Sequence, residues 1–314
     1  MSTSPAALRA AVNVDVDGLY LYDRVHGHQG GAGNSAEFDA KSHDARVWTL
    51  GVPRFLDLFA RVGAKATFFV VAQDLASAEV RAVLADVVAA GHEVGNHSLT
   101  HPYNLSRLSG EQLREELHKA RAILQDATGQ AVAGFRAPGY VLSADLIHAV
   151  IDAGHTYDSS RFPCPAYQGA KALIIQLYRL RGRPSGSIAE APAVWLGPRT
   201  PYRWTLPSGQ NIVELPIGTL PGLRLPLIAT SVIAGGEALR LATRPLLLNA
   251  DWLNFECHAI DLLDHTGDQL PARFLAQPDQ RVPLQAKWPV MLRTLEDLTA
   301  THDVATLAAW AEHV

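Results

Sequence analysis

The chain has 314 residues, of which 48% are hydrophobic and 18% charged, and a formal net charge of −4. These values are typical of a globular protein with a large core and exclude a disordered chain, and the slight negative charge without a basic run argues against a nucleic-acid-binding protein. Two cysteines are too few for a disulfide framework, and neither a long apolar run nor a secretion-signal pattern occurs, so we expect a cytoplasmic protein without a transmembrane segment.

Strand-like and helix-like segments alternate along most of the chain. The apolar run at 66–71 is continuous, which is typical of a parallel strand covered on both faces, and Ser109 with Gln112 forms a capping box at the start of a helix. In chain order, the predicted elements are a strand at 8–16, a helix at 47–61, a strand at 66–71, a helix at 79–90, a strand at 92–95, a helix at 109–128, a strand at 132–135, a helix at 143–154, a strand at 156–159, a turn at 204–211 with a strand at 212–217, and a strand at 252–259. Repeated strand–helix units predict an α/β fold with a parallel sheet.

A pair of aspartates and a pair of histidines follow two of the predicted strands. Asp15 and Asp17 end the first strand, and because side chains alternate along a strand, both carboxylates point to the same side. His97 and His101 are four residues apart and can bind one metal ion. Two histidines plus one carboxylate leave an open position for water, as catalytic zinc requires, and leave the second carboxylate free to act as a base. Taken separately, each pair has an ordinary alternative. The aspartates could be acidic turn residues, and the histidines could be core or surface residues.

Two later segments, 135–140 and 255–261, place further polar side chains at strand ends. Arg136 follows the strand at 132–135, and His258 lies near the end of the strand at 252–259. The polar residues therefore gather at the carboxyl ends of the strands, which is the face where βα barrels carry their active sites. By itself His258 would be interpreted as a core histidine, and only the company of the other motifs favours a catalytic role.

The order of these four segments resembles that of the polysaccharide deacetylase family, also called the NodB-homology family. The family carries, in order, a paired-aspartate motif, a His-[Ser/Thr]-x-x-His motif, an Arg-x-Pro motif and a late histidine motif, and the match spans residues 11–310 here. Two features depart from the family: Val16 separates the aspartates, as in its Asp-x-Asp subgroup, and the segment at 158–160 lacks the usual Trp. The resemblance implies a distorted (β/α) barrel of about seven parallel strands, which we expect to form a single domain over residues 1–314.

The resemblance also implies roles for the first group of residues. Asp17, His97 and His101 would bind a divalent metal ion, with Zn²⁺ expected and Co²⁺, Ni²⁺ or Fe²⁺ as alternatives. Asp15 would act as general base toward the attacking water. Arg136 would hold Asp15 through a charge-assisted hydrogen bond.

Further residues would act on the acyl group and the leaving amine. In the family, a backbone N–H just after the Arg-x-Pro motif stabilises the oxyanion, which corresponds to Gly139 here, with Tyr140 beside it. His258 would protonate the leaving amine as general acid. A protonated imidazole needs a nearby carboxylate that raises its pKa. Asp158 is the candidate from the motif, and Asp261 is the candidate that lies close in the sequence.

Two segments, 19–46 and 163–248, exceed what a minimal barrel needs, and we interpret them as insertions. The first is predicted to be a long polar loop that contains His26, His28 and His43. A loop of this length is usually functional, and we favour a lid over a metal-binding histidine tract. The apolar second half of 163–248 is predicted to pack on the barrel as a core helix, and the alternative is a cover over a groove for a lipid-linked or glycan substrate.

Together these features predict metal-dependent hydrolysis of an N-acyl amide, acetyl or formyl, on an amino-sugar or a related small or lipid-linked substrate. The expected partners are the acylated substrate itself and, for a lipid-linked substrate, peripheral contact with its lipid part. Two alternatives stay open: a catalytically silent glycan-binding relative, and a ring-amide hydrolase like the allantoinases. A silent relative would be expected to lack the base or a metal ligand, and this chain has both.

Overall fold

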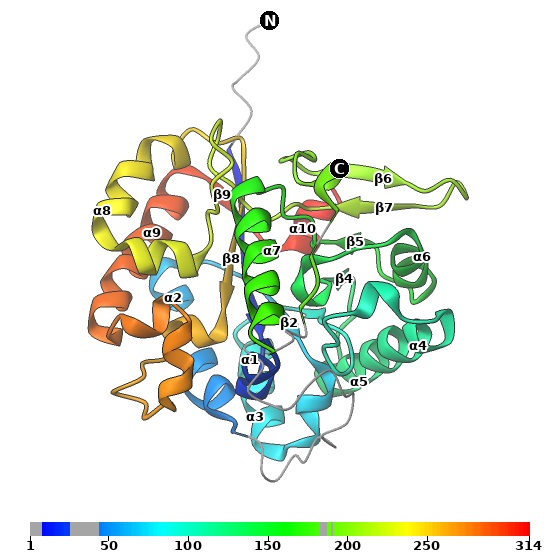
Figure 1. Ribbon diagram of the computed structural model, residues 1–314, viewed down its shortest axis with the longest axis horizontal. Helices are drawn as coiled ribbons and strands as arrows, with labels where there is room; N and C mark the ends of the chain where they lie inside the picture. Colours follow the sequence, from blue (N-terminus) through cyan, green and yellow to red (C-terminus); the bar gives the residue numbers. More distant parts are fainter. Residues whose placement is uncertain (1–7, 26–43, 183–186, 190) are drawn as a thin grey trace, which may run out of the picture.

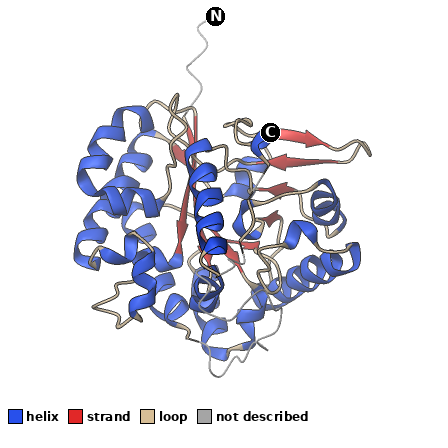
Figure 2. Ribbon diagram, viewed as in Figure 1, coloured by secondary structure: helices blue, strands red, loops and turns tan. Residues whose placement is uncertain are grey.

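The computed structural model describes residues 8–25, 44–182, 187–189 and 191–314. The described strands form one sheet in the order β6-β7-β5-β4-β3-β2-β1-β8, with the short β9 paired to β1. The strands are β1 (Arg9–Val16), β2 (Thr67–Val70), β3 (Glu93–Asn96), β4 (Gly134–Phe135), β5 (Tyr157–Asp158), β6 (Tyr202–Thr205), β7 (Asn211–Glu214), β8 (Trp252–His258) and β9 (Asp303–Val304). Helices surround these strands (Figures 1 and 2).

Seven strands of this sheet, from β7 through β1 to β8, pair in parallel, and β6 pairs with β7 as an antiparallel hairpin. The backbone after β7 then meets β8: the N–H of Gly218 donates to the carbonyl of Asn254 at 2.8 Å. A Cβ at position 218 would lie 2.7 Å from that carbonyl oxygen, so only glycine allows this approach. The predicted distorted (β/α) barrel is confirmed, and irregular backbone closes it between β7 and β8.

Some of the described helices begin or end at a recognisable sequence signal. Helix α2 ends at Gly63, which takes the left-handed conformation (φ 68°), and the side chain of Ser109 caps the helix that starts at Gly110. The α-helices are α1 (Leu19–Val25), α2 (Val52–Val62), α3 (Ala78–Ala89), α4 (Gly110–Arg114), α5 (Ala120–Thr128), α6 (Ala144–Asp152), α7 (Pro165–Leu180), α8 (Ala229–Leu247), α9 (Leu284–Thr301) and α10 (Leu307–Ala311).

Shorter turns of helix connect several of these elements. A π-helical turn leads into α2, and another joins α4 to α5, so that the predicted helix at 109–128 is continuous with only a local widening. These turns are η1 (Val47–Gly51), η2 (Ala72–Ala76), η3 (Leu105–Arg107), η4 (Glu115–Lys119), η5 (Pro138–Tyr140), η6 (Pro192–Val194), η7 (Ala259–Leu262), η8 (Ala272–Ala276) and η9 (Asp279–Arg281). Within the described ranges, no helix is both long and apolar enough to cross a bilayer.

The prediction of a polar loop over 19–46 is wrong for its first residues. Leu19–Val25 forms helix α1. The side chains of Leu19, Leu21 and Tyr22 are buried, so their packing holds this short helix against the barrel. The remaining part, 26–43, with His26, His28 and His43, lies outside the described residues. The lid and the histidine tract stay predictions.

The segment 163–248 forms helix α7, the β6–β7 hairpin and helix α8. The predicted core helix is found in α8, which contacts α9 and β8 and buries Ala229, Val232 and Ile233. Helix α7 differs, because it crosses in front of the sheet in Figure 1 and, across its sixteen residues, buries fully only Gln168. That the whole chain forms one domain stays a prediction.

Candidate active site

Three of the predicted metal ligands converge on one point. Asp17 follows β1, and His97 and His101 follow β3, the second parallel neighbour of β1. The Nε2 atoms of His97 and His101 lie 3.3 and 3.5 Å from Oδ1 of Asp17, and all three side chains are buried. One ligand atom from each residue lies within 4.8 Å of the others, a spacing that one metal ion can bridge.

The loop that carries the two histidines is held in an unusual backbone conformation. Ser98 and His101 both have positive φ, 68° and 55°, which costs free energy for residues other than glycine. Hydrogen bonds within the loop support this shape, since the Ser98 N–H donates to the Asn96 side chain and the His101 N–H donates to the Ser98 hydroxyl. The turn brings both imidazoles to the same side, toward Asp17.

A further carboxylate, Glu116 on η4, fastens this loop from outside. It accepts the backbone N–H groups of Leu99 and Thr100 at 3.0 and 2.9 Å and the hydroxyl of Thr100 at 2.6 Å. Sequence reasoning did not identify Glu116, because its sixteen-residue separation from the loop carries no periodic signal. It positions the histidines without contacting them.

The chemistry of these three donors fits a divalent metal ion. The Nδ1 of His97 contacts the Arg136 carbonyl at 2.8 Å, so this nitrogen carries the proton and the lone pair of Nε2 points toward Asp17. Oδ1 of Asp17 is buried and has no hydrogen bond within the described part of the chain, an arrangement that calls for a cation. Burial would raise the pKa of Asp17, but His101 and His97, in their protonated forms, hold it below its usual range. Burial in turn lowers the pKa of His101 to about 4 and so favours its neutral, metal-binding form.

Asp15 and Arg136 form a buried ion pair beside this cluster. The guanidinium of Arg136 donates to Oδ1 of Asp15 at 2.7 Å and to the backbone carbonyl and hydroxyl of Ser159 at 2.7 and 2.8 Å. It also lies 4.3 Å from the ring centre of Phe69 and contacts the side chain of Asn13. The second oxygen of Asp15 accepts no hydrogen bond from any described residue, and Asp15 lines the pocket.

His258 lines the same pocket next to Glu256 and Tyr140, and it is the register partner of Asp15 on the neighbouring strand β8. Its Nδ1 lies 3.4 Å from Oε1 of Glu256, and its Nε2 lies 3.2 Å from the hydroxyl of Tyr140, which also donates to Glu256. Burial would lower the pKa of His258, but Glu256 and the surrounding aspartates raise it to about 9. This shift favours the protonated form of His258 at neutral pH.

Asp158, the motif-based partner for His258, does not take that place. Its carboxylate accepts the Ser160 hydroxyl at 2.6 Å and faces Glu214, its register neighbour on β7. We therefore replace Asp158 by Glu256, which sequence reasoning missed although it precedes His258 by two residues and so shares its side of the strand. Asp261, the other candidate, raises the pKa of His258 less than Glu256 does. Its carboxylate accepts a hydrogen bond from the backbone N–H of His258 at 2.8 Å.

Gly139 and Tyr140 lie in the turn η5, where both have positive φ, 66° and 64°. Gly139 lines the pocket, and its carbonyl accepts a hydrogen bond from the Lys171 ammonium at 2.7 Å. A Cβ at position 139 would come within 3.3 Å of the Tyr103 ring, so the pocket wall is tight at this point. The oxyanion role of Gly139 stays a prediction.

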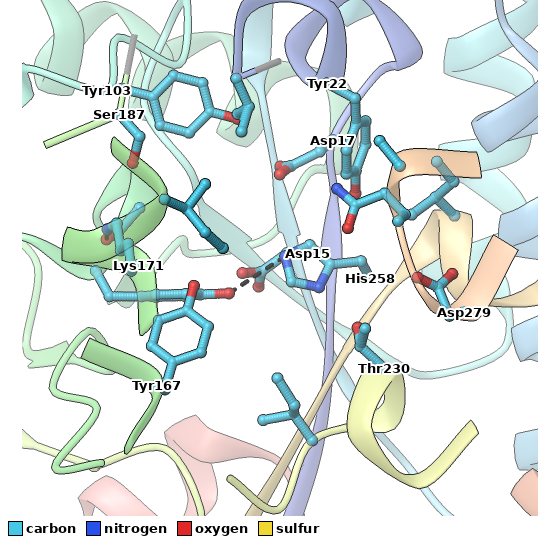
Figure 3. A pocket seen from close by; sticks show the side chains of 18 of the residues that line it. Asp15, Asp17, Tyr22, Tyr103, Tyr167, Lys171, Ser187, Thr230, His258 and Asp279 are labelled. Atoms are coloured by element: carbon cyan, nitrogen blue, oxygen red, sulfur yellow. Dashed lines mark hydrogen bonds between the residues drawn. The ribbon is translucent and has the colours of Figure 1, made fainter. Parts of the chain in front are cut away.

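These groups share one pocket of about 400 Å³. Its walls combine tyrosines with carboxylates, a mixture suited to the flat faces and hydroxyls of a sugar ring. In Figure 3, Lys171 and Tyr167 of α7 lie on one side, and His258, Thr230 and Asp279 lie on the other. The tyrosines that line the pocket are Tyr22, Tyr103, Tyr140, Tyr167 and Tyr178.

Comparison with known proteins gives a consistent set of relatives. Residues 37–157 match the polysaccharide deacetylase family model. A peptidoglycan deacetylase of Helicobacter pylori is 30% identical over 138 residues, which are 44% of this chain and 46% of that protein. A chitooligosaccharide deacetylase of a Bradyrhizobium strain is 33% identical over 103 residues, 32% of this chain and 46% of that protein. The chain thus spans about half the length of the curated relatives that it matches.

Solved structures support the fold. A Mycobacterium smegmatis protein provisionally named a polysaccharide deacetylase has a TM-score of 0.59 at 20% identity, and the match covers 100% of this chain and 92% of that protein's chain. The PuuE allantoinase has a TM-score of 0.60 at 16% identity, and the match covers 99% of this chain and 91% of the allantoinase chain. At these identities the likeness establishes the barrel and leaves the reaction open.

Proposed function

We propose that the protein hydrolyses the N-acyl amide of an amino-sugar with the help of a divalent metal ion, because residues 37–157 match the polysaccharide deacetylase family model. One observation carries the proposal: the three candidate metal ligands, the Asp15 carboxylate that pairs with buried Arg136, and His258 all line the same pocket. The names of the curated relatives, peptidoglycan and chitooligosaccharide deacetylase, support an acylated amino-sugar as the substrate.

Asp17, His97 and His101 would hold the metal ion, since their donor atoms converge and Asp17 is buried with an uncompensated oxygen. When bound there, a divalent ion supplies Lewis acidity toward water and toward the acyl carbonyl. Two imidazoles and one carboxylate suit Zn²⁺, and Co²⁺, Ni²⁺ and Fe²⁺ remain alternatives for the same donors.

Asp15 acts as the general base in this proposal. Its Oδ1 is held by Arg136, so the unpaired Oδ2 is fixed toward the pocket and accepts the proton of the attacking water. Because Arg136 is itself fastened by Ser159 and Asn13, the base cannot rotate away. A positioned base contributes roughly 10²–10⁴-fold to the rate.

His258 acts as the general acid. Protonation of the amide nitrogen lets the C–N bond break and the free amine leave, and the imidazolium needed for this step is stabilised by Glu256. The Tyr140 hydroxyl contacts both groups and fixes their relative orientation. Gly139, at the edge of the pocket, stays our candidate for the oxyanion contact.

The test is amine release by the purified, Zn²⁺-supplemented protein. We expect free amine from N-acetyl or N-formyl amino-sugars, with no release from allantoin, and an Asp15→Asn variant should bind the metal but release at least a hundredfold less amine. Binding of chitooligosaccharides without cleavage would favour the silent glycan-binding alternative, and cleavage of allantoin would favour the ring-amide alternative. The cytoplasmic location stays a prediction, to be tested by cell fractionation.

A further inference from the structure

Helix α7 has one face toward the pocket and another toward solvent. Tyr167, Lys171, Ile175 and Tyr178 line the pocket from one face of this helix, at the spacing of successive helical turns. Ile174 also lines the pocket, yet its side chain is 49% exposed. The helix therefore forms a wall of the pocket, and at Ile174 that wall reaches solvent.

The outer face of α7 is an apolar stripe. Leu173, Ile174, Leu177 and Leu180 are 61%, 49%, 40% and 82% exposed, and their spacing places them along one side of the helix. We call these four residues the α7 stripe. Contiguous exposed apolar side chains of this size are unusual on a surface that faces only water, and they mark a contact with something apolar.

The charges along the α7 segment itself are of one sign. From Ser159 to Gly182 the chain has no Asp or Glu, although its overall formal charge is −4. Arg179 and Arg181 flank Leu180 and are exposed. An apolar stripe with basic residues at its end is the pattern of a helix that lies in the interface of an anionic bilayer.

Another exposed apolar surface of the protein shows a different pattern. Leu241 and Leu246 on α8 are 54% and 38% exposed, but that helix also carries ion pairs of Arg240 and Arg244 with Asp297. Mixed charges of this kind are typical of a solvated face. The α8 surface has fewer exposed apolar side chains and carries both signs of charge, so it serves as a control for the loss of two exposed leucines at another place.

We propose that the α7 stripe docks on an anionic lipid bilayer, and that the substrate of the pocket is an amino-sugar carried on a lipid anchor. The substrate part of this inference rests on the proposed function, whereas the docking part does not. Ile174 belongs to both the pocket and the stripe. The lipid anchor of a sugar bound in the pocket can therefore extend along the stripe into the bilayer. A second copy of the chain fits less well, because it would bring the same acid-free basic segment against itself.

Vesicle sedimentation tests the docking directly. We expect the full chain to sediment with vesicles of phosphatidylcholine and phosphatidylglycerol in equal parts, less with phosphatidylcholine alone, and less at high salt. The Leu177→Gln/Leu180→Gln and Arg179→Gln/Arg181→Gln variants should bind about tenfold more weakly, while Leu241→Gln/Leu246→Gln should bind like the wild type. The docking is wrong if the wild type does not sediment with anionic vesicles, if all variants bind equally, or if the stripe instead mediates a dimer detected by sedimentation velocity.

Two glycosides with the same head group test the substrate class. We expect kcat/KM to be higher for the dodecyl than for the methyl glycoside of N-acetylglucosamine, and Leu177→Gln/Leu180→Gln to remove that preference without changing the methyl value. Equal kcat/KM for both glycosides in the wild type would overturn the lipid-anchored substrate. Vesicle binding without amine release from either glycoside or from its N-formyl counterpart would reject the proposed function and leave the docking intact.

Discussion

Glu256→Gln probes the acid side of the site with a nearly isosteric change. Glu256 is fully buried, and its Oε1 lies 3.4 Å from Nδ1 of His258. At an effective dielectric constant of about 20, a unit charge at that distance stabilises the imidazolium by about 5 kcal/mol, equivalent to about 3.6 pH units. The His258 side chain is 20% exposed, and solvent screens part of this interaction, so we expect the pKa of His258 to fall by about one to two units from about 9.

The sign of the effect on activity follows from the role of the group. His258 must be protonated to act as general acid, so kcat/KM should fall as pH rises through its pKa, and the variant should lose activity at a lower pH than the wild type. The assay is the pH profile of kcat/KM, together with an NMR titration of the His258 ring protons, which does not require turnover. Glu214→Gln serves as control, because it neutralises a buried carboxylate that faces Asp158. An alkaline limb and an NMR pKa that are both unchanged in Glu256→Gln would refute this assignment.

Three other predictions address the metal, the loop and acid stability. His97→Ala should lose bound divalent metal, measured by elemental analysis, with an unchanged circular dichroism spectrum; full metal occupancy would contradict the ligand assignment. Glu116→Gln should weaken metal affinity by about 10–100-fold through the loop it fastens, with full affinity as the contrary result. His155 is buried, its Nε2 contacts Asn96 at 3.1 Å, and burial lowers its pKa to about 4. Its neutral form therefore contributes stability above about pH 6.5 that is lost as pH falls to about 4, up to about 3 kcal/mol. Urea unfolding of His155→Gln should show a flatter acid limb, and an acid limb as steep as that of the wild type would contradict it.

The sequence was most informative where order along the chain determines position in the barrel. Parallel strands place their carboxyl ends at one face, so Asp15, Asp17 and His97 could be brought together from their places after predicted strands. Asp158 is likewise the last residue of a strand, β5, but its orientation depends on Glu214 of the neighbouring β7, and that pairing cannot be read from either segment alone.

Helix α7 shows a second limit. Apolar residues at helical spacing, such as Leu173, Leu177 and Leu180, normally predict a buried face, yet here that face is exposed. Periodicity identifies an apolar side of a helix but does not identify what covers it. The loop prediction for Leu19–Val25 was wrong for a related reason. So short a helix lacks a repeating pattern, and its contacts with the barrel fix its conformation.

The histidine loop has a consequence for how the protein acquires its cofactor. Glu116, Asn96 and Ser98 hold the loop through hydrogen bonds to its backbone and to the Thr100 hydroxyl, and the ligand nitrogens take no part in them. We therefore expect the loop to keep its shape without an ion, unlike in a zinc finger, where binding and folding are one event. Ions should exchange at this site by simple dialysis of the native protein. The metal that the protein carries in a cell would then reflect which ions that compartment supplies.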